Sequence, residues 1–267
     1  MSDVKKQIEK ISSIFHEAHL FAEEVKTQQE LISFLESNDN EFRSVAYEGA
    51  AMALALKDFS TGKTLHQWRA FMEGPGAKHI AQIHVGLGWA IAQLKIPVLP
   101  ILENIKPIMQ TRVADGCGYY EGMFRQKQLI KKPFTSFDER SLPEYLDEKI
   151  IHSFVQGIGR SIWYLSNGEI NKMTNSIQRF SEAFHGDLWR GTGIACAYAG
   201  GCDESQLKNI FSTASFHSEQ LKQGASLAAG TRYHAGAITK DVDLACRVWC
   251  NLSVEEAMIS SQTESVL

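Results

Sequence analysis

Titratable side chains recur beside glycines along this chain and could perform acid–base chemistry. Glu48 and Glu121 each directly precede a glycine, His84 lies two residues before Gly86, and Asp187 lies in the stretch GDLWRG. A carboxylate or imidazole inside a pocket can donate or accept a proton, and burial tunes its pKa. We therefore treat Glu48, His84, Glu121 and Asp187 as candidate catalytic residues. The alternative for each is a structural hydrogen bond, and Asp187 could simply cap a helix that begins at Leu188.

A second set of residues, polar or aromatic, has the types that a ligand groove needs. Arginine binds carboxylate or phosphate through paired hydrogen bonds, and aromatic rings supply apolar walls. The candidate ligand-binding residues are Tyr47, Tyr120, Gln156, Arg160, Trp163, Trp189, Arg190 and Gln223. Other titratable residues close to these are His79, Asp115 and His185. Salt bridges and hydrogen bonds between helices are the alternative interpretation of the whole set.

The glycines that accompany these residues are regularly spaced. The leading glycines are Gly49, Gly86, Gly122, Gly157, Gly191 and Gly224, with successive gaps of 37, 36, 35, 34 and 33 residues. A small residue stands four positions after five of these six glycines. Two small residues one turn apart on the same face of a helix allow a neighbouring helix to approach closely. The residues just before the glycines form a mostly polar row: Glu48, Val85, Glu121, Gln156, Arg190 and Gln223.

The elements that must position these residues are predicted to be helices. Apolar residues recur at helical spacing in residues 3–24 and 143–165, and six prolines leave long uninterrupted stretches. A helix pair about every 35 residues is typical of an α-hairpin repeat array, in which neighbouring hairpins stack. The sequence therefore predicts an all-α, tetratricopeptide-like solenoid with little or no sheet. An irregular all-α domain is the alternative.

We expect three parts along the chain: an N-terminal helical segment at 1–40, the helical-repeat domain at 41–260, and a disordered tail at 261–267. The stretch Asp115-Gly116-Cys117-Gly118 is expected to form a turn before a helix. The concave face of the array would carry the polar row and its flanking aromatic residues.

Bulk composition excludes several classes of protein. A net charge of −4 gives no basic footprint for nucleic acid, and no apolar run is long enough to span a membrane. The N-terminus lacks the pattern of a signal peptide. The five cysteines are read as reduced thiols of a cytoplasmic protein, and no metal or other cofactor is predicted. The sequence gives no prediction of oligomeric state.

Several longer segments point to a family. FRSVAYEGAAMALAL, HIAQIHVGLGWAIAQL, DGCGYYEGMF, FVQGIGRSIWYL and GDLWRGTGIACAYAGG resemble a bacterial family of unknown function encoded in polyketide gene clusters, notably those for enediynes. Similar stretches occupy about residues 40–260. The resemblance implies natural-product biosynthesis in a bacterial cytoplasm, with a polyene or acyl intermediate nearby. It supplies no catalytic residues.

Three functions follow as hypotheses. The first is an accessory protein of secondary metabolism whose concave surface binds an apolar intermediate or a synthase partner. The second is an enzyme, a cyclase, isomerase or hydrolase, that acts on a polyene or acyl substrate in a pocket enclosed by the repeats. The third is a scaffold that only assembles other proteins.

Overall fold

The computed structural model describes residues 3–62, 65–131 and 150–264, and every regular element in these ranges is helical. The prediction of an all-α protein is confirmed. The helices are α1 (Asp3–Glu24), α2 (Gln28–Glu36), α3 (Asn40–Ser60), α4 (His66–Glu73), α5 (Ile80–Leu94), α6 (Leu99–Leu102), α7 (Pro107–Lys131), α8 (Ile151–Ser166), α9 (Ile170–Ile177), α10 (His185–Ala199), α11 (Glu204–Ala214), α12 (Ser218–His234), α13 (Lys240–Ala245) and α14 (Val254–Glu264).

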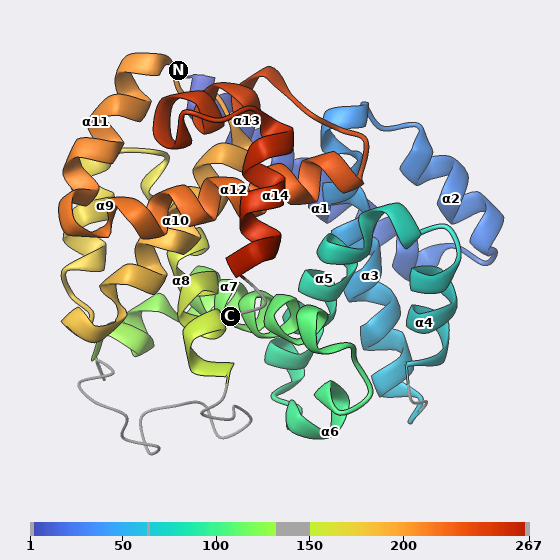
Figure 1. Cartoon of the computed structure of the whole chain (residues 1–267). Coiled ribbons are helices and arrows are strands. Elements are labelled where there is room, and N and C mark those ends of the chain that lie inside the picture. Colours follow the sequence, from blue (N-terminus) through green and yellow to red (C-terminus); the bar gives the residue numbers. More distant parts are fainter. Residues whose placement is uncertain (1–2, 63–64, 132–149, 265–267) are drawn as a thin grey trace.

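The long helices pack against one another in the order of the chain (Figure 1). Helix α1 packs on α3, and the contacts continue through α5, α7, α8, α10 and α12 to α14. The shorter helices α2, α4, α6, α9, α11 and α13 alternate with most of these long ones in the chain. The likeness of this order to a tetratricopeptide array stays a prediction.

Helices near the two ends of this series, α3 and α12, are joined by hydrogen bonds. Asn40 at the start of α3 donates from Nδ2 to the carbonyl of Gly236, 3.0 Å away and just after α12. The Arg232 guanidinium of α12 donates to the carbonyl of Glu41 in α3 and, at 2.6 Å, to that of Tyr198 in α10. These bonds tie the last part of the series to its beginning.

Pairs of glycines two residues apart allow the long helices to approach closely. Such pairs occur in α5, α7, α8 and α10, as Gly86/Gly88, Gly116/Gly118, Gly157/Gly159 and Gly191/Gly193. A Cβ on the first glycine would collide with the backbone of the preceding long helix, and one on the second with that of the following long helix. Two residues turn a helix by about 200°, so each pair clears opposite sides of its helix.

The spacing of the glycines in α7 differs from the sequence prediction. Gly116, and not Gly122, contacts the preceding long helix, where its missing Cβ leaves room for the backbone of Val85. Gly122 instead faces the side chain of Ser161 in α8. The residue that precedes the packing glycine in α7 is therefore Asp115. The expected turn at Asp115–Gly118 is wrong, because this stretch lies inside α7.

The predicted helix at 143–165 and the predicted tail at 261–267 are described only in part. The helix predicted over 143–165 is described from Ile151, and residues 132–149 lie outside the described ranges. Residues 261–264 of the predicted tail belong to α14, and 265–267 are outside the description. The buried face of α1, with Ile8, Ile11 and Ile14, lies in the same hydrophobic core as the rest of the chain.

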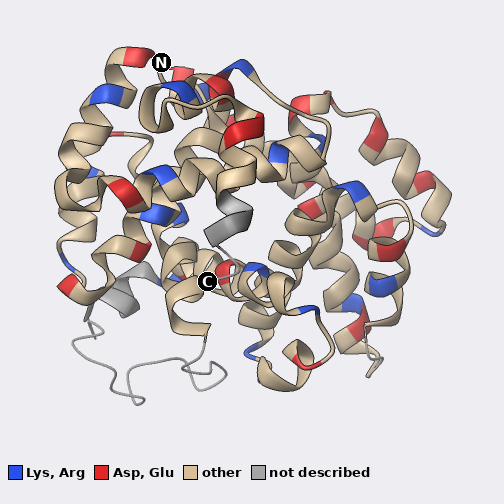
Figure 2. Ribbon diagram, viewed as in Figure 1, with Lys and Arg blue, Asp and Glu red and all other residues tan. Residues whose placement is uncertain are grey.

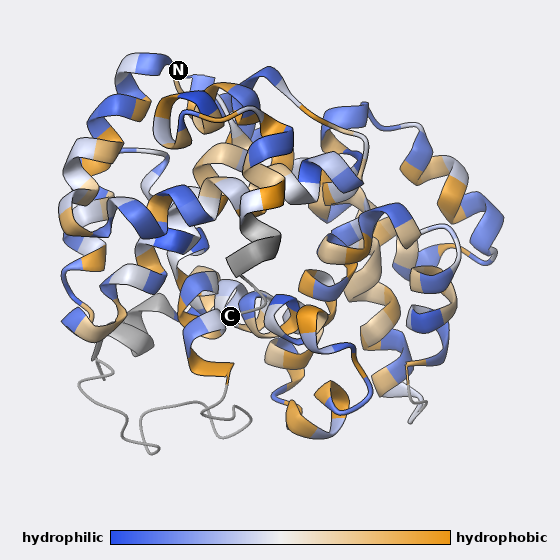
Figure 3. Cartoon of the chain, viewed as in Figure 1, coloured by the Kyte–Doolittle hydropathy of each residue, from blue (hydrophilic) through white to orange (hydrophobic). Residues whose placement is uncertain are grey.

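Charge and hydropathy differ between the mostly buried helix α5 and the mostly exposed helix α2. Helix α5 carries no Asp, Glu, Lys or Arg and is uniformly tan in Figure 2. The outer helix α2 alternates between hydrophobic and hydrophilic positions in Figure 3, and buries only Leu31 and Leu35. In the described part of the chain, no helix is both long and apolar enough to cross a membrane.

Candidate functional site

A buried ion pair links two long helices near the middle of the molecule. The carboxylate of Asp115 in α7 accepts a hydrogen bond from Arg160 Nη1 and another, 2.8 Å long, from Gln156 Nε2. Both donors come from α8, one turn apart, so they reach the same carboxylate. The Arg160 guanidinium also lies over the ring of Tyr119, 4.6 Å from its centroid.

Glu48 of α3 lies close to this ion pair. Its Oε2 accepts a hydrogen bond of 2.9 Å from Gln82 Nε2 in α5, and the residue is 4% exposed. Burial raises the pKa of Glu48 to about 7; Asp115 adds to the rise, and Arg160 opposes it. We call Glu48, Gln82, Asp115, Gln156 and Arg160 the polar layer.

On one side of the polar layer is a cavity of about 240 Å³, which we call the apolar chamber. Its walls come from α1, α3, α5, α7, α8 and α10, and include Phe15, Val45, Trp89, Tyr119, Met123, Tyr164 and Tyr198. Trp89 meets Tyr119 edge to face, with ring centroids 4.7 Å apart. The chamber's charged groups are Glu48 and Arg160, both from the polar layer, and its exposed rim has Ser12, His16 and Phe124.

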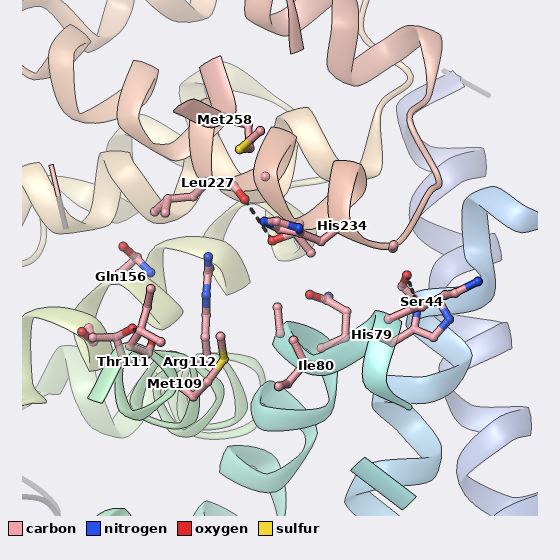
Figure 4. A pocket seen from close by; sticks show the side chains of 18 of the residues that line it. Ser44, His79, Ile80, Met109, Thr111, Arg112, Gln156, Leu227, His234 and Met258 are labelled. Carbon is pink, nitrogen blue, oxygen red and sulfur yellow. Dashed lines mark hydrogen bonds between the residues drawn. The ribbon is translucent and has the colours of Figure 1, made fainter. Parts of the chain in front are cut away.

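A second cavity, of about 410 Å³, lies at the centre of the helical array and is called the central cavity (Figure 4). Gln82 and Gln156 of the polar layer line it, together with residues of α3, α7, α10, α12 and α14. Gln82 in this cavity bonds Glu48 in the chamber, and Asp115 bonds both Gln156 in this cavity and Arg160 in the chamber. The polar layer thus connects the linings of the two cavities.

The structure divides four of the eight predicted ligand-binding residues between these cavities. Gln156, Arg190 and Gln223 line the central cavity, where Arg190 Nε donates to Gln223 Oε1 over 3.0 Å. Arg160 and the predicted acid Glu48 line the apolar chamber. The single concave row expected from the sequence is therefore not what these residues form, because Glu48 faces a different space from Gln156, Arg190 and Gln223.

The other predicted catalytic residues line neither cavity. His84 Nδ1 is 2.7 Å from the carbonyl of Ile80. Glu121 pairs with Arg125 at 2.7 Å. Asp187 contacts His152 Nδ1 at 2.7 Å and Arg190 Nη1 at 3.4 Å.

Asp187 is not an N-cap, contrary to one of the alternatives above. Helix α10 already begins at His185, so Asp187 lies within its first turn, and its side chain bonds His152 and Arg190. Asp187 therefore contacts a lining residue of the central cavity, Arg190, without lining the cavity itself.

The remaining predicted aromatic residues also lie outside both linings. The hydroxyl of Tyr47 donates to Glu36 over 2.9 Å, and its ring stacks on His79. Trp163 and Trp189 are buried in the core. Tyr120 packs against Phe124, which is itself on the rim of the chamber.

Residues 1–266 match a family described as a protein of unknown function, DUF1702. The chain belongs to this family. No curated protein and no solved structure matches it. The match agrees with the expectation of a family of unknown function. It also covers the N-terminal segment, so that α1, which contributes Phe15 to the chamber, is part of the DUF1702 region.

Sequence reasoning did not place Gln82 and Arg112 in the site of this DUF1702 chain, and it named Asp115 only as a titratable residue close to the candidates. Asp115 could have been found from Gly116 and Gly118, because the same Gly-x-Gly spacing occurs in α5, α8 and α10. Gln82 and Arg112 had no comparable signal, since neither lies beside a glycine of the series.

The cysteines and metal-ligating residues add no further centre to the described ranges. All five cysteines are free, and burial raises the pKa of the Cys246 thiol to about 12. No group of three or more His, Cys, Asp or Glu side chains within residues 3–62, 65–131 and 150–264 could hold a metal ion.

Proposed function

We propose that this DUF1702 chain binds an apolar small molecule in the apolar chamber, as an accessory protein of bacterial secondary metabolism. The observation that carries the proposal is a cavity of about 240 Å³ with aromatic and aliphatic walls, in which Glu48 and Arg160 are the charged groups. Apolar walls with a few polar groups that fix orientation are typical of small-molecule sites.

The aromatic lining of the chamber favours a ring system or a short polyene. Trp89, Tyr119 and Tyr164 present stacked and edge-on rings, and Tyr119 and Tyr164 lie 5.5 Å apart between centroids. Such surfaces pack well against flat, unsaturated molecules. Glu48 and Arg160 would position a hydroxyl or carbonyl group of the ligand.

A small molecule is a better occupant than a segment of a synthase. A helix with its side chains is about 10 Å wide, and a chamber of about 240 Å³ cannot contain one. The polyketide setting and a cytoplasmic location are part of the proposal, and they are supported by the family resemblance of the sequence segments.

Binding of N-phenyl-1-naphthylamine, a neutral apolar probe, tests this function. We expect its fluorescence to rise on binding to the unsubstituted chain. Ser12→Trp, at the rim of the chamber, should weaken binding at least tenfold. Ser13→Trp is the matched control, because Ser13 is the next exposed residue of α1 and does not line the chamber. Equal binding by both variants, or no binding by the unsubstituted chain, would overturn the proposal.

An enzyme is the second candidate, and the buried carboxyl of Glu48 favours it. A carboxyl group with a pKa of about 7 is suited to general acid–base catalysis at neutral pH. It lines the chamber, so it would contact any molecule bound there.

Glu48→Gln separates the two candidates. The protein would be purified from a host that makes the polyketide, and its bound small molecules would be identified by mass spectrometry. An enzyme should carry a different molecule, the unconverted substrate, when Glu48 is replaced. A pure binding protein should carry the same molecule as the unsubstituted chain.

A further inference from the structure

The central cavity has a charge pattern that the apolar chamber lacks. Lys78, Arg112 and Arg190 line it, and no Asp or Glu is among the described residues of its lining. Arg190 is already engaged, since it contacts Asp187 at 3.4 Å and Gln223 at 3.0 Å. Lys78 is exposed. Arg112 is therefore the cation whose bonding decides what this cavity can hold.

Arg112 projects into the cavity without a partner of its own. Its side chain rises from α7 between Gln156 on one side and Ile80 on the other (Figure 4). It has no hydrogen bond or ion pair with any residue in the described part of the chain. The nearby carboxylate of Asp115 already accepts hydrogen bonds from Arg160 and Gln156.

The surroundings of Arg112 disfavour an isolated charge. Burial lowers the pKa of Arg112, and Arg160 adds to the lowering, while Asp115 opposes it. A partly buried guanidinium with five N–H donors and no acceptor is costly unless something supplies the acceptors. A carboxylate or a phosphate group does so, because two of its oxygens accept two parallel hydrogen bonds from the guanidinium.

Part of the cavity wall near Arg112 is apolar, beside polar lining residues such as Gln156 and Thr231. Met109 of α7, Leu227 of α12 and Met258 of α14 face the cavity around Arg112 (Figure 4). Methionine and leucine side chains adapt to flexible hydrocarbon. A volume of about 410 Å³ is within the range of small-molecule sites.

We propose that the central cavity is a second ligand site, separate from the apolar chamber, for an amphipathic organic anion. Arg112 binds the carboxylate or phosphate head group, and Met109, Leu227 and Met258 contact the hydrocarbon part.

Isothermal titration calorimetry with three matched probes tests this site. Decanoate and decyl phosphate carry the two head groups, and decanol has the same chain without charge. We expect at least one anion to bind the unsubstituted chain ten times more tightly than decanol, and the tighter of the two identifies the head group. Raising the ionic strength should weaken the binding of the two anions and leave the binding of decanol unchanged.

Substitutions locate the binding. Arg112→Gln should weaken anion binding at least tenfold. Arg112→Lys should retain part of the affinity, because the lysine ammonium still supplies a positive point charge. Arg179→Gln is the control, because Arg179 is exposed and does not line the cavity. If Arg112→Gln does not fold, Met258→Trp serves instead, since it fills the cavity and should abolish anion binding.

Two outcomes would overturn this site: decanol binding as tightly as both anions, or anion binding that survives both Arg112→Gln and Met258→Trp. The result is independent of the proposed function, because the Arg112 variants should leave N-phenyl-1-naphthylamine binding unchanged. Ser12→Trp should likewise leave anion binding unchanged.

Discussion

Asp115 of α7 and Arg160 of α8 form an ion pair whose side chains are 0% and 6% exposed. Removing charges from water is costly, and only good geometry with further hydrogen bonds offsets that cost. Here Gln156 supplies a second donor to the carboxylate, and the Tyr119 ring lies under the guanidinium. The pair therefore fixes how α7 and α8 meet at the polar layer, and through it the position of Arg160 in the apolar chamber.

Asp115→Asn should destabilise the protein strongly. The substitution replaces the carboxylate that pairs with Arg160 by a neutral amide. Breaking a buried ion pair in this way costs about 3–5 kcal/mol. The free energy of unfolding in urea measures the effect. Glu204→Gln makes the same chemical change at the exposed Glu204–Lys208 pair and should cost less than about 1 kcal/mol. Similar losses in both variants would contradict the role given to Asp115.

Gly116→Ala tests the assignment of the packing glycine in α7. The new Cβ would meet the backbone of Val85, which cannot move aside as a side chain can. We expect a loss of about 2 kcal/mol or more, as for overpacked cores. Gly186→Ala in α10 is the control, because its Cβ would meet only the flexible Gln220 side chain at 3.4 Å. Alanine should there gain up to about 1 kcal/mol from helix propensity. A neutral Gly116→Ala would show that α5 and α7 are not in close contact.

Glu48 should make the protein less stable as the pH rises towards neutrality. Its pKa is about 7 in the folded chain and near 4.5 in the unfolded chain, so between these values only the folded state holds the proton. Stability therefore falls as the pH rises from about 4.5 to 7, by about 3 kcal/mol, and then levels off.

Glu48→Gln should remove this slope. Relative to the unsubstituted chain, the variant should become more stable between pH 5 and 8, as followed by urea unfolding at each pH. His79 has the opposite effect on the pH dependence of stability. Burial lowers its pKa to about 4, so its contribution to the free energy of unfolding is lost as the pH falls from about 6.5. Both chains contain His79, so its contribution cancels in the difference. A difference that stays constant with pH would show that Glu48 is ionised throughout.

Arg232→Met should loosen the closure between α12 and the first part of the chain. It removes charge-assisted hydrogen bonds to the carbonyls of Glu41 and Tyr198, and it removes a guanidinium 3.9 Å from the Tyr198 ring centroid. We expect a loss of about 2–4 kcal/mol and faster amide hydrogen exchange in α12. Arg247→Met removes an exposed arginine that pairs with the half-buried Asp243, and it should change stability by less than about 1 kcal/mol. Unchanged exchange in α12 would contradict this role.

Much of the fold could be read from local pattern. The helical period of apolar residues predicted α1, and Ile8, Ile11 and Ile14 are buried as that pattern requires. The glycines indicated close helix packing, which the structure shows at both members of each Gly-x-Gly pair. These features depend on neighbours three or four residues away, so a sequence carries them directly.

The candidate site was predictable only in part. Glu48, Gln156, Arg160, Arg190 and Gln223 do line cavities, as polar residues next to packing glycines were expected to do. Their division between two cavities was not predictable, because it depends on which side of the polar layer each side chain reaches. The assumption of equal spacing also favoured Gly122 over Gly116 as the packing glycine of α7. That assumption fails because the segments between the helices differ in length.

The sequence by itself determined that the chain is helical, where its helices can approach closely, and which residue types lie near those contacts. The tertiary structure alone decided the pairings: Asp115 meets Gln156 and Arg160 from 41 and 45 residues away, and Arg112 pairs with no carboxylate of the described residues. The reason is physical. Helical periodicity is a local property, but the offset of one helix along its neighbour is set by packing across the whole array, and that offset chooses which polar groups touch.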